Sequence, residues 1–264
     1  MNLGLQGKLA LVTGSTAGIG FGIAAALAEE GARVVINGRT EGRVNQALET
    51  LRKQYRGAEF SGVAADLGTA SGVASLVKEV PSADILVNNL GIFEVKGFLD
   101  IPDEDWLRFF EVNVMSGVRL SRQYLPGMLA KNWGRIIFIS SESAQNIPSE
   151  MVHYGMTKTA QVAIARGLAE SVAGTGVTVN SVLPGPTTSE GVSSFVQDMA
   201  RHQGISVAEI EKQFFATVRP SSLLKRFETP EEVAAVVAFV ASAQGAIMNG
   251  AAVRAEGGML RSIL

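Results

Sequence analysis

The architecture of this chain can be inferred outward from the stretch Lys8-Leu9-Ala10-Leu11-Val12-Thr13-Gly14-Ser15-Thr16-Ala17-Gly18-Ile19-Gly20. Its first half is a short apolar run typical of a buried strand, and its second half is a turn rich in glycine. A stretch of helical period follows directly, over residues 18–30. A strand that passes through such a turn into a helix opens a βαβ unit, which predicts a parallel sheet.

The same alternation continues along the rest of the chain. Short runs rich in β-branched residues are nearly continuous in apolar character, as in strands buried on both faces, and longer stretches of helical period separate them. The expected strands are 8–13, 33–37, 59–64, 84–88, 135–140, 178–182 and 251–255. The expected helices are 18–30, 41–55, 70–80, 103–131, 152–173 and 230–242.

These elements predict an α/β fold in which residues 1–264 form one domain. We expect a Rossmann-like, doubly wound parallel sheet of about seven strands with helices on both faces. The alternative is a (β/α)8 barrel, which needs eight evenly spaced units. Seven strands and two unusually long helices fit an open sheet better.

One segment, 186–227, breaks this rhythm between the sixth and seventh expected strands, where a crossover needs far fewer residues. Phe195, Met199, Phe214 and Phe215 lie among polar residues there, which predicts one or two short helices with an apolar face. Such an insertion lies over the carboxyl ends of the strands, where open α/β sheets bind ligands. We interpret it as a substrate lid; the alternative is a surface excursion without function.

Composition limits the partners. The chain has 23 Lys plus Arg against 25 Asp plus Glu, so we expect no nucleic-acid or membrane partner and favour a small molecule. It has no cysteine and only two histidines, His153 and His202, so disulfides, thiolate chemistry and a metal site are not expected. No leader-like start and no apolar run of roughly 18 residues are present, which predicts a soluble, cytoplasmic protein.

The glycine-rich turn indicates a nucleotide. Gly14, Gly18 and Gly20 allow positive φ angles and a close approach of the backbone to a pyrophosphate, which then meets the helix N-terminus. The spacing is GxxxGxG, whereas the commoner dinucleotide fingerprint is GxGxxG. A Walker A loop is excluded because the Gly-Lys-Ser/Thr ending is missing.

The end of the second expected strand indicates which dinucleotide. NAD sites carry an acidic residue there, about 20 residues after the glycines, that accepts hydrogen bonds from the ribose 2′-hydroxyl. This chain has Ile36-Asn37-Gly38-Arg39-Thr40, without a carboxylate. Arg39 is placed to bind a 2′-phosphate, so we favour NADP(H) over NAD(H). The alternative is that Arg39 is a solvated loop residue.

A tyrosine and a lysine indicate proton transfer. Tyr154 and Lys158 share one face of the expected helix 152–173, one turn apart, and Ser141 lies thirteen residues before Tyr154. A phenol is a poor acid or base near pH 7, but a fixed cation stabilises the phenolate and lowers the pKa. The spacing therefore predicts that Lys158 lowers the pKa of the Tyr154 phenol. His153 points about 100° away from Tyr154, which favours a packing or surface role.

With these motifs the chain resembles the short-chain dehydrogenase/reductase family over nearly its whole length. The motifs fall in the order and spacing of that family, and together they are highly specific: the turn 13–20, Asp66-Leu67, Asn88-Asn89-Leu90-Gly91, Asn113, Ser141, Tyr154-x-x-x-Lys158 and Pro184-Gly185. One residue departs from the family pattern, because Leu90 stands where alanine is usual and adds bulk beside the cofactor cleft.

The resemblance implies four catalytic residues. Tyr154 would be the general acid/base that exchanges a proton with the substrate oxygen, and Ser141 would hydrogen-bond that oxygen. Lys158 would lower the pKa of Tyr154 and hold the nicotinamide ribose. Asn113 would anchor a water that links Lys158 to solvent; its alternative role is a buried polar residue bonded to backbone. Ser140 and Ser143 are alternatives to Ser141 that the spacing disfavours.

The resemblance also implies the cofactor site. Tyr154 and Lys158 would contact the cofactor as well. The other residues would lie in the glycine turn, at the ribose 2′ position, beside adenine, in the cleft and at the nicotinamide end, in that order: Gly14, Ser15, Thr16, Gly18, Ile19 and Gly20; Arg39; Asp66 and Leu67; Asn89 and Gly91; Pro184, Gly185 and Thr187.

The implied function is an oxidoreductase that transfers a hydride between NADP(H) and a carbonyl or secondary alcohol. A non-catalytic nucleotide-binding scaffold or sensor on the same fold is the alternative. A narrower possibility is a 3-oxoacyl carrier-protein reductase, against which Asn132 and Thr175 stand where that enzyme has docking arginines. Relatives assemble as tetramers through the helices matching 103–131 and 152–173, so a homotetramer is expected.

Overall fold

The computed structural model describes residues 2–188 and 190–263, in which seven parallel strands form one sheet. The strands run in the order β3-β2-β1-β4-β5-β6-β7, which reverses between β1 and β4 and creates the switch point where such sheets bind ligands. Every predicted strand is confirmed, with shifts of one or two residues at its ends: β1 (Leu9–Val12), β2 (Arg33–Gly38), β3 (Phe60–Ala64), β4 (Ile85–Asn88), β5 (Gly134–Ile139), β6 (Val177–Pro184) and β7 (Ala252–Ala255).

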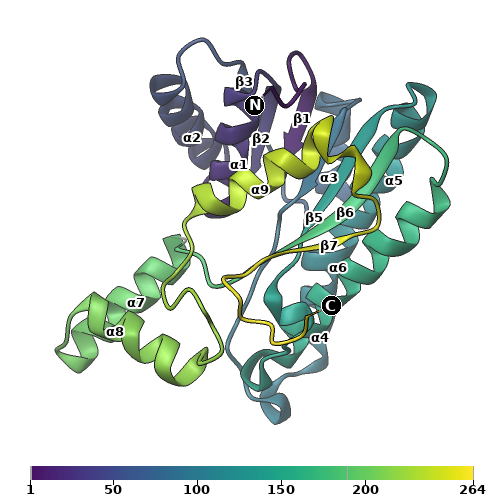
Figure 1. Cartoon of the computed structure of the whole chain (residues 1–264). Coiled ribbons are helices and arrows are strands. Elements are labelled where there is room, and N and C mark those ends of the chain that lie inside the picture. The colour runs from purple at the N-terminus through teal and green to yellow at the C-terminus, as the bar shows by residue number, and fades with distance from the viewer. Residues whose placement is uncertain (1, 189, 264) are drawn as a thin grey trace.

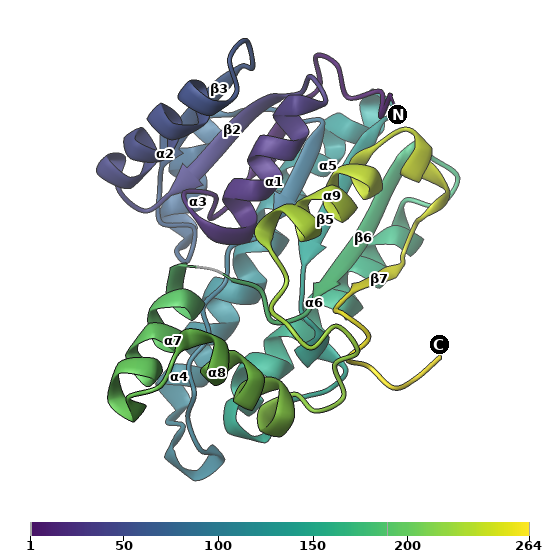
Figure 2. The same cartoon turned by 60° about the vertical axis from the view of Figure 1, so that its left-hand side comes forward.

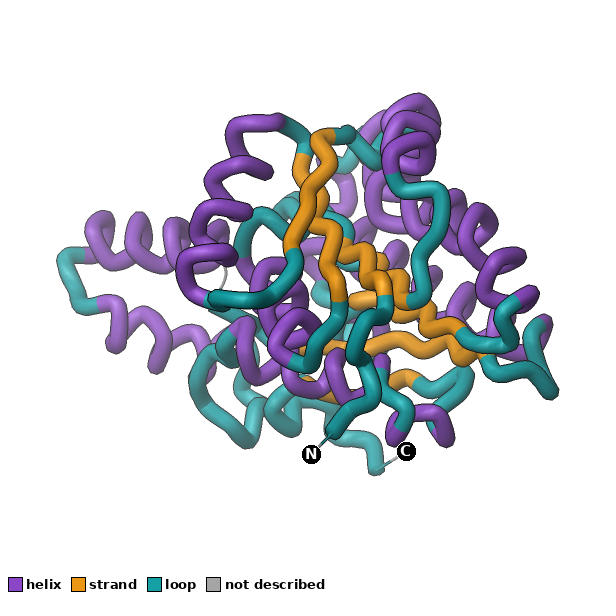
Figure 3. Tube along the Cα trace, turned by 90° about the horizontal axis from the view of Figure 1, so that it is seen from above, coloured by secondary structure: helices purple, strands orange, loops and turns teal. Residues whose placement is uncertain are grey.

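Helices cover both faces of the sheet (Figure 3). One apolar core joins the first face to α1 (Gly18–Glu29), α2 (Glu41–Gln54) and α9 (Pro230–Ala241). A second core joins the other face to α3 (Ala70–Glu79), α5 (Ser116–Ala130) and α6 (Val152–Ser171). The doubly wound, Rossmann-like arrangement predicted from the sequence is therefore confirmed (Figure 1).

The turn between β1 and α1 depends on glycine at specific positions. Gly14 and Gly18 have φ angles of 58° and 57°, in the left-handed region that residues with a Cβ avoid. Gly20 is required for space, because a Cβ there would lie 2.5 Å from the Asn89 side-chain nitrogen. The helix can therefore start directly against the end of β4.

Buried polar side chains hold this turn in place. Ser15 donates its hydroxyl to the Val12 carbonyl at 2.6 Å and accepts the Asn37 amide at 2.9 Å. The Asn37 side chain accepts the Gly14 amide at 3.3 Å and donates to the Val63 carbonyl at 3.1 Å. The carboxyl ends of β1, β2 and β3 are thus joined by one satisfied hydrogen-bond network, which gives the turn a single conformation.

The single long helix predicted over 103–131 is wrong in one respect. The structure has α4 (Asp103–Phe110), then a π-helical turn (Glu111–Met115), then α5. A π turn inserts one extra residue into the helix, and such turns often occur at functional sites. The apolar residues over 103–131 were interpreted as one continuous helix, so the sequence did not reveal this turn.

The insertion forms α7 (Glu190–Gln203), α8 (Val207–Gln213) and a π-helical turn (Phe214–Val218), which project away from the sheet (Figure 2). An apolar cluster joins these elements, as predicted, and includes Phe215 and Phe227, with Met199 and Phe214 packed against it. The side chain of Phe195 lies outside the described residues. Within the described ranges, no helix is both long and apolar enough to cross a membrane.

Candidate active site

The predicted catalytic residues meet at the carboxyl ends of β4 and β5. Ser141 directly follows β5, Tyr154 and Lys158 lie in the first turns of α6, and Asn113 lies in the π-helical turn. Lys158 Nζ donates to the Ile139 carbonyl at 2.9 Å, which ties α6 to the end of β5. Its Nζ also lies 5.6 Å from the centre of the Tyr154 ring. Residues distant in sequence therefore share one small volume.

The three neighbouring serines have different partners. Ser141 accepts the Ser143 amide at 3.1 Å, is hydrogen-bonded to the Tyr154 phenol and lines the cavity described below. Ser140 donates its hydroxyl to the Lys158 carbonyl at 2.8 Å and thereby fastens α6. Ser143 donates its hydroxyl to Glu142 at 3.1 Å. Ser141, the serine that the spacing favoured, is thus the one of the three that is hydrogen-bonded to Tyr154.

The two ionisable groups of the pair are both shifted by burial. Burial raises the pKa of Tyr154 to about 12, although the hydrogen bond to Ser141 opposes this rise. Burial lowers the pKa of Lys158 to about 8. The Tyr154 pKa therefore lies above its ordinary value, opposite to the direction expected from the sequence. Desolvation of the phenolate outweighs the hydrogen bond to Ser141.

The side chain of Asn113 is fully engaged with its surroundings. It accepts the Ile92 amide at 2.8 Å and donates to the Ile92 carbonyl at 3.0 Å and to the Thr157 hydroxyl at 3.0 Å. This is the alternative role considered above, a buried polar residue bonded to backbone. The Asn113 backbone carbonyl points to α6 and accepts the Gln161 amide at 2.5 Å.

The start of α1 fits a phosphate group. Its N-cap, Ala17, makes no side-chain hydrogen bond to the first amides of the helix, and Ile19 reaches the cavity wall. Free amides at a helix N-terminus bind anions, so the pyrophosphate of a dinucleotide fits this turn. Thr16 packs against Gly38, where a Cβ would lie 2.5 Å from the Thr16 methyl carbon. The Ser15 side chain is buried in the network below the turn.

The residues expected around adenine differ in how exposed their side chains are. Arg39 and Asp66 are exposed, and Asp66 accepts the Gly68 amide at 3.1 Å. The Leu67 side chain is only 1% exposed and lies in the core beside α3 and α5, so only its backbone is available to a ligand. Asn37 turns its side chain inward to β3, so it cannot replace the acidic residue of an NAD site.

The segment after β4 supports the glycine turn. Asn89 donates its side-chain amide to the carbonyls of Thr13 and Gly14, both at 2.9 Å. Leu90 is partly buried and packs against the core beside α3, α5 and α6, which accounts for its larger side chain. Gly91 comes close to Lys158, since a Cβ there would lie 3.5 Å from the Lys158 Nζ.

At the other end of the site, Pro184 is buried at the end of β6 and Thr187 donates its hydroxyl to the Gly185 carbonyl at 3.0 Å. The Gly185 amide donates to the Glu228 carboxylate at 3.1 Å. Burial raises the pKa of Glu228 to about 7. Sequence reasoning missed Glu228, because it lies far along the chain from Gly185 and belongs to none of the motifs.

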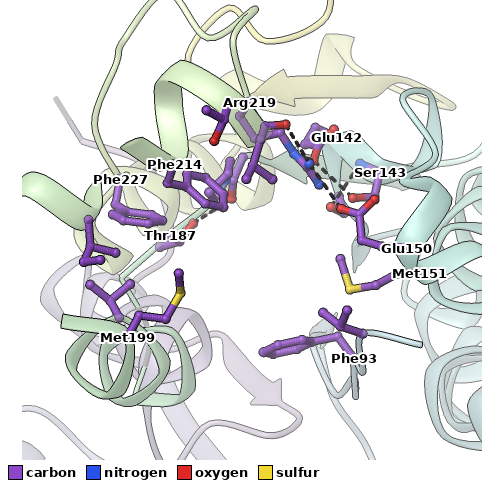
Figure 4. A pocket seen from close by; sticks show the side chains of 18 of the residues that line it. Phe93, Glu142, Ser143, Glu150, Met151, Thr187, Met199, Phe214, Arg219 and Phe227 are labelled. Atoms are coloured by element: carbon purple, nitrogen blue, oxygen red, sulfur yellow. Dashed lines mark hydrogen bonds and ion pairs between the residues drawn. The ribbon is translucent and has the colours of Figure 1, made fainter. Parts of the chain in front are cut away.

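A cavity of about 670 Å³ opens beside Ser141 and Tyr154. Most of its lining is apolar, and Figure 4 shows Met199, Phe214 and Phe227 on one side with Phe93 and Met151 on the other. The first group comes from the insertion, and the second from loops after β4 and before α6. Its size and mostly apolar walls suit a small molecule that exposes few charges.

An ion-pair cluster closes the polar end of this cavity. Arg219 Nε lies 3.1 Å from a Glu142 oxygen, and its terminal nitrogen lies 3.5 Å from Glu150 (Figure 4). Arg219 and Glu142 are 8% and 2% exposed. Burial raises the pKa of Glu142, and Arg219 opposes that rise. Sequence reasoning missed this cluster; the one available signal was a carboxylate directly after Ser141.

His153 has a packing role, one of the two alternatives that the sequence left open. It is fully buried, with its ring centre 4.0 Å from that of Phe109 and 6.0 Å from that of Trp106. Burial lowers its pKa. Across the described ranges, no group of three or more His, Asp or Glu residues is arranged to hold a metal ion.

Comparisons with known proteins agree with this arrangement. The family profile described as short chain dehydrogenase matches residues 8–200. The chain is 52% identical to the uncharacterized oxidoreductase YvaG of Bacillus subtilis, over 100% of both chains. It is 36% identical to the D-beta-hydroxybutyrate dehydrogenase of Cupriavidus necator, over 96% of this chain and 98% of that protein. The structure of L-sorbose reductase from Gluconobacter frateurii, complexed with NADPH and L-sorbose, matches 100% of each chain with a TM-score of 0.94 and 32% identity.

The Arg219 cluster yields a stability prediction. Arg219→Met leaves the buried Glu142 carboxylate unpaired, so we expect a loss of about 3 to 5 kcal/mol in the free energy of unfolding at pH 8. A carboxyl whose pKa is higher in the folded than in the unfolded state binds protons on folding, so the loss should shrink toward pH 5. Urea denaturation at both pH values measures this.

The control is Arg166→Met, which removes an exposed ion pair with Glu170 and should cost about 0.5 kcal/mol or less. The double variant Arg219→Met/Glu142→Gln should recover most of the stability, because no buried charge remains unpaired. A loss that is equal at both pH values and persists in the double variant would contradict this account.

Proposed function

This chain belongs to the short-chain dehydrogenase/reductase family and is one of its oxidoreductases; from that premise, we propose that it transfers a hydride between NADP(H) and a small, largely apolar ketone or secondary alcohol. The observation that supports this most is that Ser141 and Tyr154 meet at one wall of the cavity, with Lys158 Nζ 5.6 Å from the centre of the Tyr154 ring.

We propose that the chain's own residues manage the substrate oxygen and its proton. The nicotinamide cofactor, when bound, supplies or accepts the hydride. Ser141 holds the substrate oxygen through a hydrogen bond, and the Tyr154 hydroxyl gives that oxygen a proton as negative charge develops on it. In the reverse direction the Tyr154 phenolate takes the proton back.

The charge left on Tyr154 requires a stabilising partner. With a pKa of about 12, the phenol holds its proton until the substrate oxygen becomes strongly basic. Once the proton has left, the phenolate lies beside the Lys158 ammonium, which is 5.6 Å from the ring centre. Their attraction is large in a buried site, so Lys158 favours the charged state of Tyr154 that the reaction passes through.

Preference for NADP(H) over NAD(H) is the finer part of this proposal. Arg39 follows β2 and is exposed, and Thr40 caps the following helix by accepting the Arg43 amide at 3.4 Å. The guanidinium of Arg39 can bind a 2′-phosphate, and neither Asn37 nor Gly38 offers a carboxylate to repel it. L-Sorbose reductase, the similar solved structure, was complexed with NADPH.

We further propose that the insertion 186–227 is a substrate lid. Its side chains Met199 and Phe214 form one wall of the cavity, opposite Phe93. Arg219 ties its end to Glu142, the residue after Ser141, so closure of the lid and placement of the catalytic serine are mechanically linked. If so, Arg219→Met should raise the KM for the substrate more than it changes NADPH binding.

The two alternatives are less well supported. A non-catalytic scaffold has no need for the Ser141, Tyr154 and Lys158 arrangement. A carrier-protein substrate would require basic residues for docking, but Asn132 accepts the Gly176 amide at 2.7 Å and Thr175 donates its hydroxyl to the Val172 carbonyl at 2.7 Å. Both are turn-stabilising residues. A free small molecule is therefore the better proposal.

Assembly and location are also proposals. We expect a cytoplasmic location. We expect a homotetramer because α4 and the segment before it expose large apolar side chains that a partner subunit would cover. Leu99, Leu107 and Phe110 are 95%, 67% and 39% exposed. Exposed apolar patches of this kind often mark protein interfaces.

The proton-transfer role of Tyr154 predicts the effect of Tyr154→Phe. Loss of the hydroxyl should lower kcat by about 10² to 10⁴ on a panel of ketones and secondary alcohols. NADPH affinity, measured by nicotinamide fluorescence, should stay within about threefold, because the ring remains. Tyr55→Phe, which removes a phenol packed on Phe60, is the control. Near-normal turnover by Tyr154→Phe would refute the assignment.

The role of Arg39 predicts a change in cofactor selectivity. Arg39→Ser should weaken NADPH binding by roughly ten- to a hundredfold, the value of a charge-assisted hydrogen bond, and leave NADH binding nearly unchanged. Fluorescence titration with both cofactors measures this. Arg56→Ser, an exposed arginine beyond the other end of α2, is the matched control. Tenfold tighter binding of NADH than of NADPH by the wild-type protein would contradict the proposed preference for NADP(H).

The expected assembly predicts a mass four times the 27.8 kDa of one chain. Light scattering on a size-exclusion column measures it. Leu107→Glu places a charge in the exposed apolar surface of α4 and should shift the protein toward smaller species. A wild-type mass equal to a single chain would contradict the tetramer.

A further inference from the structure

A buried glutamine lies beside the catalytic pair and belongs to none of the motifs. Gln161 follows Lys158 by nearly one turn of α6 and is only 1% exposed. Its side-chain oxygen accepts a hydrogen bond from Lys158 Nζ at 3.4 Å. Its side-chain nitrogen donates to the Asn113 backbone carbonyl at 2.5 Å. One amide therefore joins the ammonium to the π-helical turn.

We propose that Gln161 is a positioning residue, whose amide holds the Lys158 ammonium between β5 and the π-helical turn on the side that faces Tyr154. An ammonium has three donors. Lys158 directs one to the Ile139 carbonyl and one to Gln161, which leaves the third for Tyr154 or a bound ligand. The inference rests on the proposed function, because it concerns the same site.

The neighbours of the amide fix its orientation. With the amide turned over, its nitrogen would face the Lys158 ammonium, donor against donor, and its oxygen would face the Asn113 carbonyl, acceptor against acceptor. Only the observed orientation satisfies both partners. The orientation of the Gln161 amide is therefore set by one group that can only donate, the Lys158 ammonium, and one that can only accept, the Asn113 carbonyl.

Packing alone does not explain a glutamine at this place. An apolar side chain of similar volume would fill the space between α6 and the π-helical turn equally well. It would leave the Lys158 ammonium, which is 5% exposed, without one of its acceptors. Removal of a partner from a buried charged group costs far more than removal of a surface hydrogen bond. The amide is therefore explained by the hydrogen bond that it accepts from the Lys158 ammonium.

The amide binds the backbone carbonyl of Asn113, the residue to which the family resemblance assigned a water. A side-chain amide keeps its protons near neutral pH, so it holds Lys158 in place without relaying a proton. The π-helical turn contributes by directing the Asn113 carbonyl toward α6. Lys158 is thereby oriented by protein groups from two elements.

Two variants separate positioning from packing. Gln161→Met preserves volume and removes both hydrogen bonds, so the pKa of Lys158 should fall below its wild-type value. Gln161→Glu places a carboxylate against the ammonium and should raise that pKa. Within the described ranges, burial is the cause that lowers the Lys158 pKa, and Tyr154 is its titratable neighbour, so opposite shifts are expected. NMR of protein labelled at lysine Cε, with the signal assigned by Lys158→Met, measures both.

Activity supplies a second readout. On a panel ketone that the wild type reduces, Gln161→Met should lower kcat by roughly ten- to a hundredfold, the effect of a misplaced catalytic group, and change KM less. The limb of the kcat pH profile should move in the direction of the NMR shift. Asn180→Leu is the matched control, since Asn180 is fully buried and bridges the Met248 carbonyl and the Ala251 amide.

The outcomes are distinct. Opposite shifts of the Lys158 pKa in the two glutamine variants, absent from Asn180→Leu, support the positioning role. Shifts that are no larger than those in Asn180→Leu overturn it, whatever the activity. If no panel substrate is turned over by the wild type, the proposed function fails, while the NMR titration still decides the role of Gln161.

Discussion

The site is organised around one constraint, the burial of the Lys158 ammonium. An unpaired cation inside a protein costs several kcal/mol or shifts to its neutral form, so acceptors must be brought to it. The Ile139 carbonyl at the end of β5 supplies one at 2.9 Å, and Gln161 supplies another. Ser140 fastens the same helix through the Lys158 carbonyl at 2.8 Å. These contacts fix α6 against the sheet and thereby place Tyr154.

Polar contacts also fix the glycine-rich turn between β1 and α1. The side chains of Ser15 and Asn37 hydrogen-bond the turn to three strands, and the side chain of Asn89 hydrogen-bonds it to the end of β4. The groups left without side-chain partners are the first amides of α1. A rigid support therefore surrounds an unsatisfied helix end, which is what anion binding requires. Several residues of the family motif support the cleft from beneath, while their neighbours face it.

Much of the fold and part of the site could be predicted from local patterns. Strand positions follow from apolar runs, and β1 to α1 follows from glycine spacing, because these signals depend on neighbouring residues only. The spacing of Ser141 to Tyr154 selected the serine that faces the phenol over Ser140. The π-helical turn, the buried Glu228 and the Arg219 cluster escaped prediction, since each depends on contacts between residues distant in the chain.

By itself, the amino-acid sequence determined the doubly wound sheet, the glycine-rich turn and the phenol–ammonium pair, because periodicity, glycine geometry and helical spacing are local properties. Only the tertiary structure decided how charged groups are solvated. It reversed the expected direction of the Tyr154 pKa, since burial outweighs the hydrogen bond to Ser141. It also gave the Asn113 carbonyl to Gln161 and paired Arg219 with Glu142. Desolvation depends on every atom packed around a group, and no spacing within one segment encodes it.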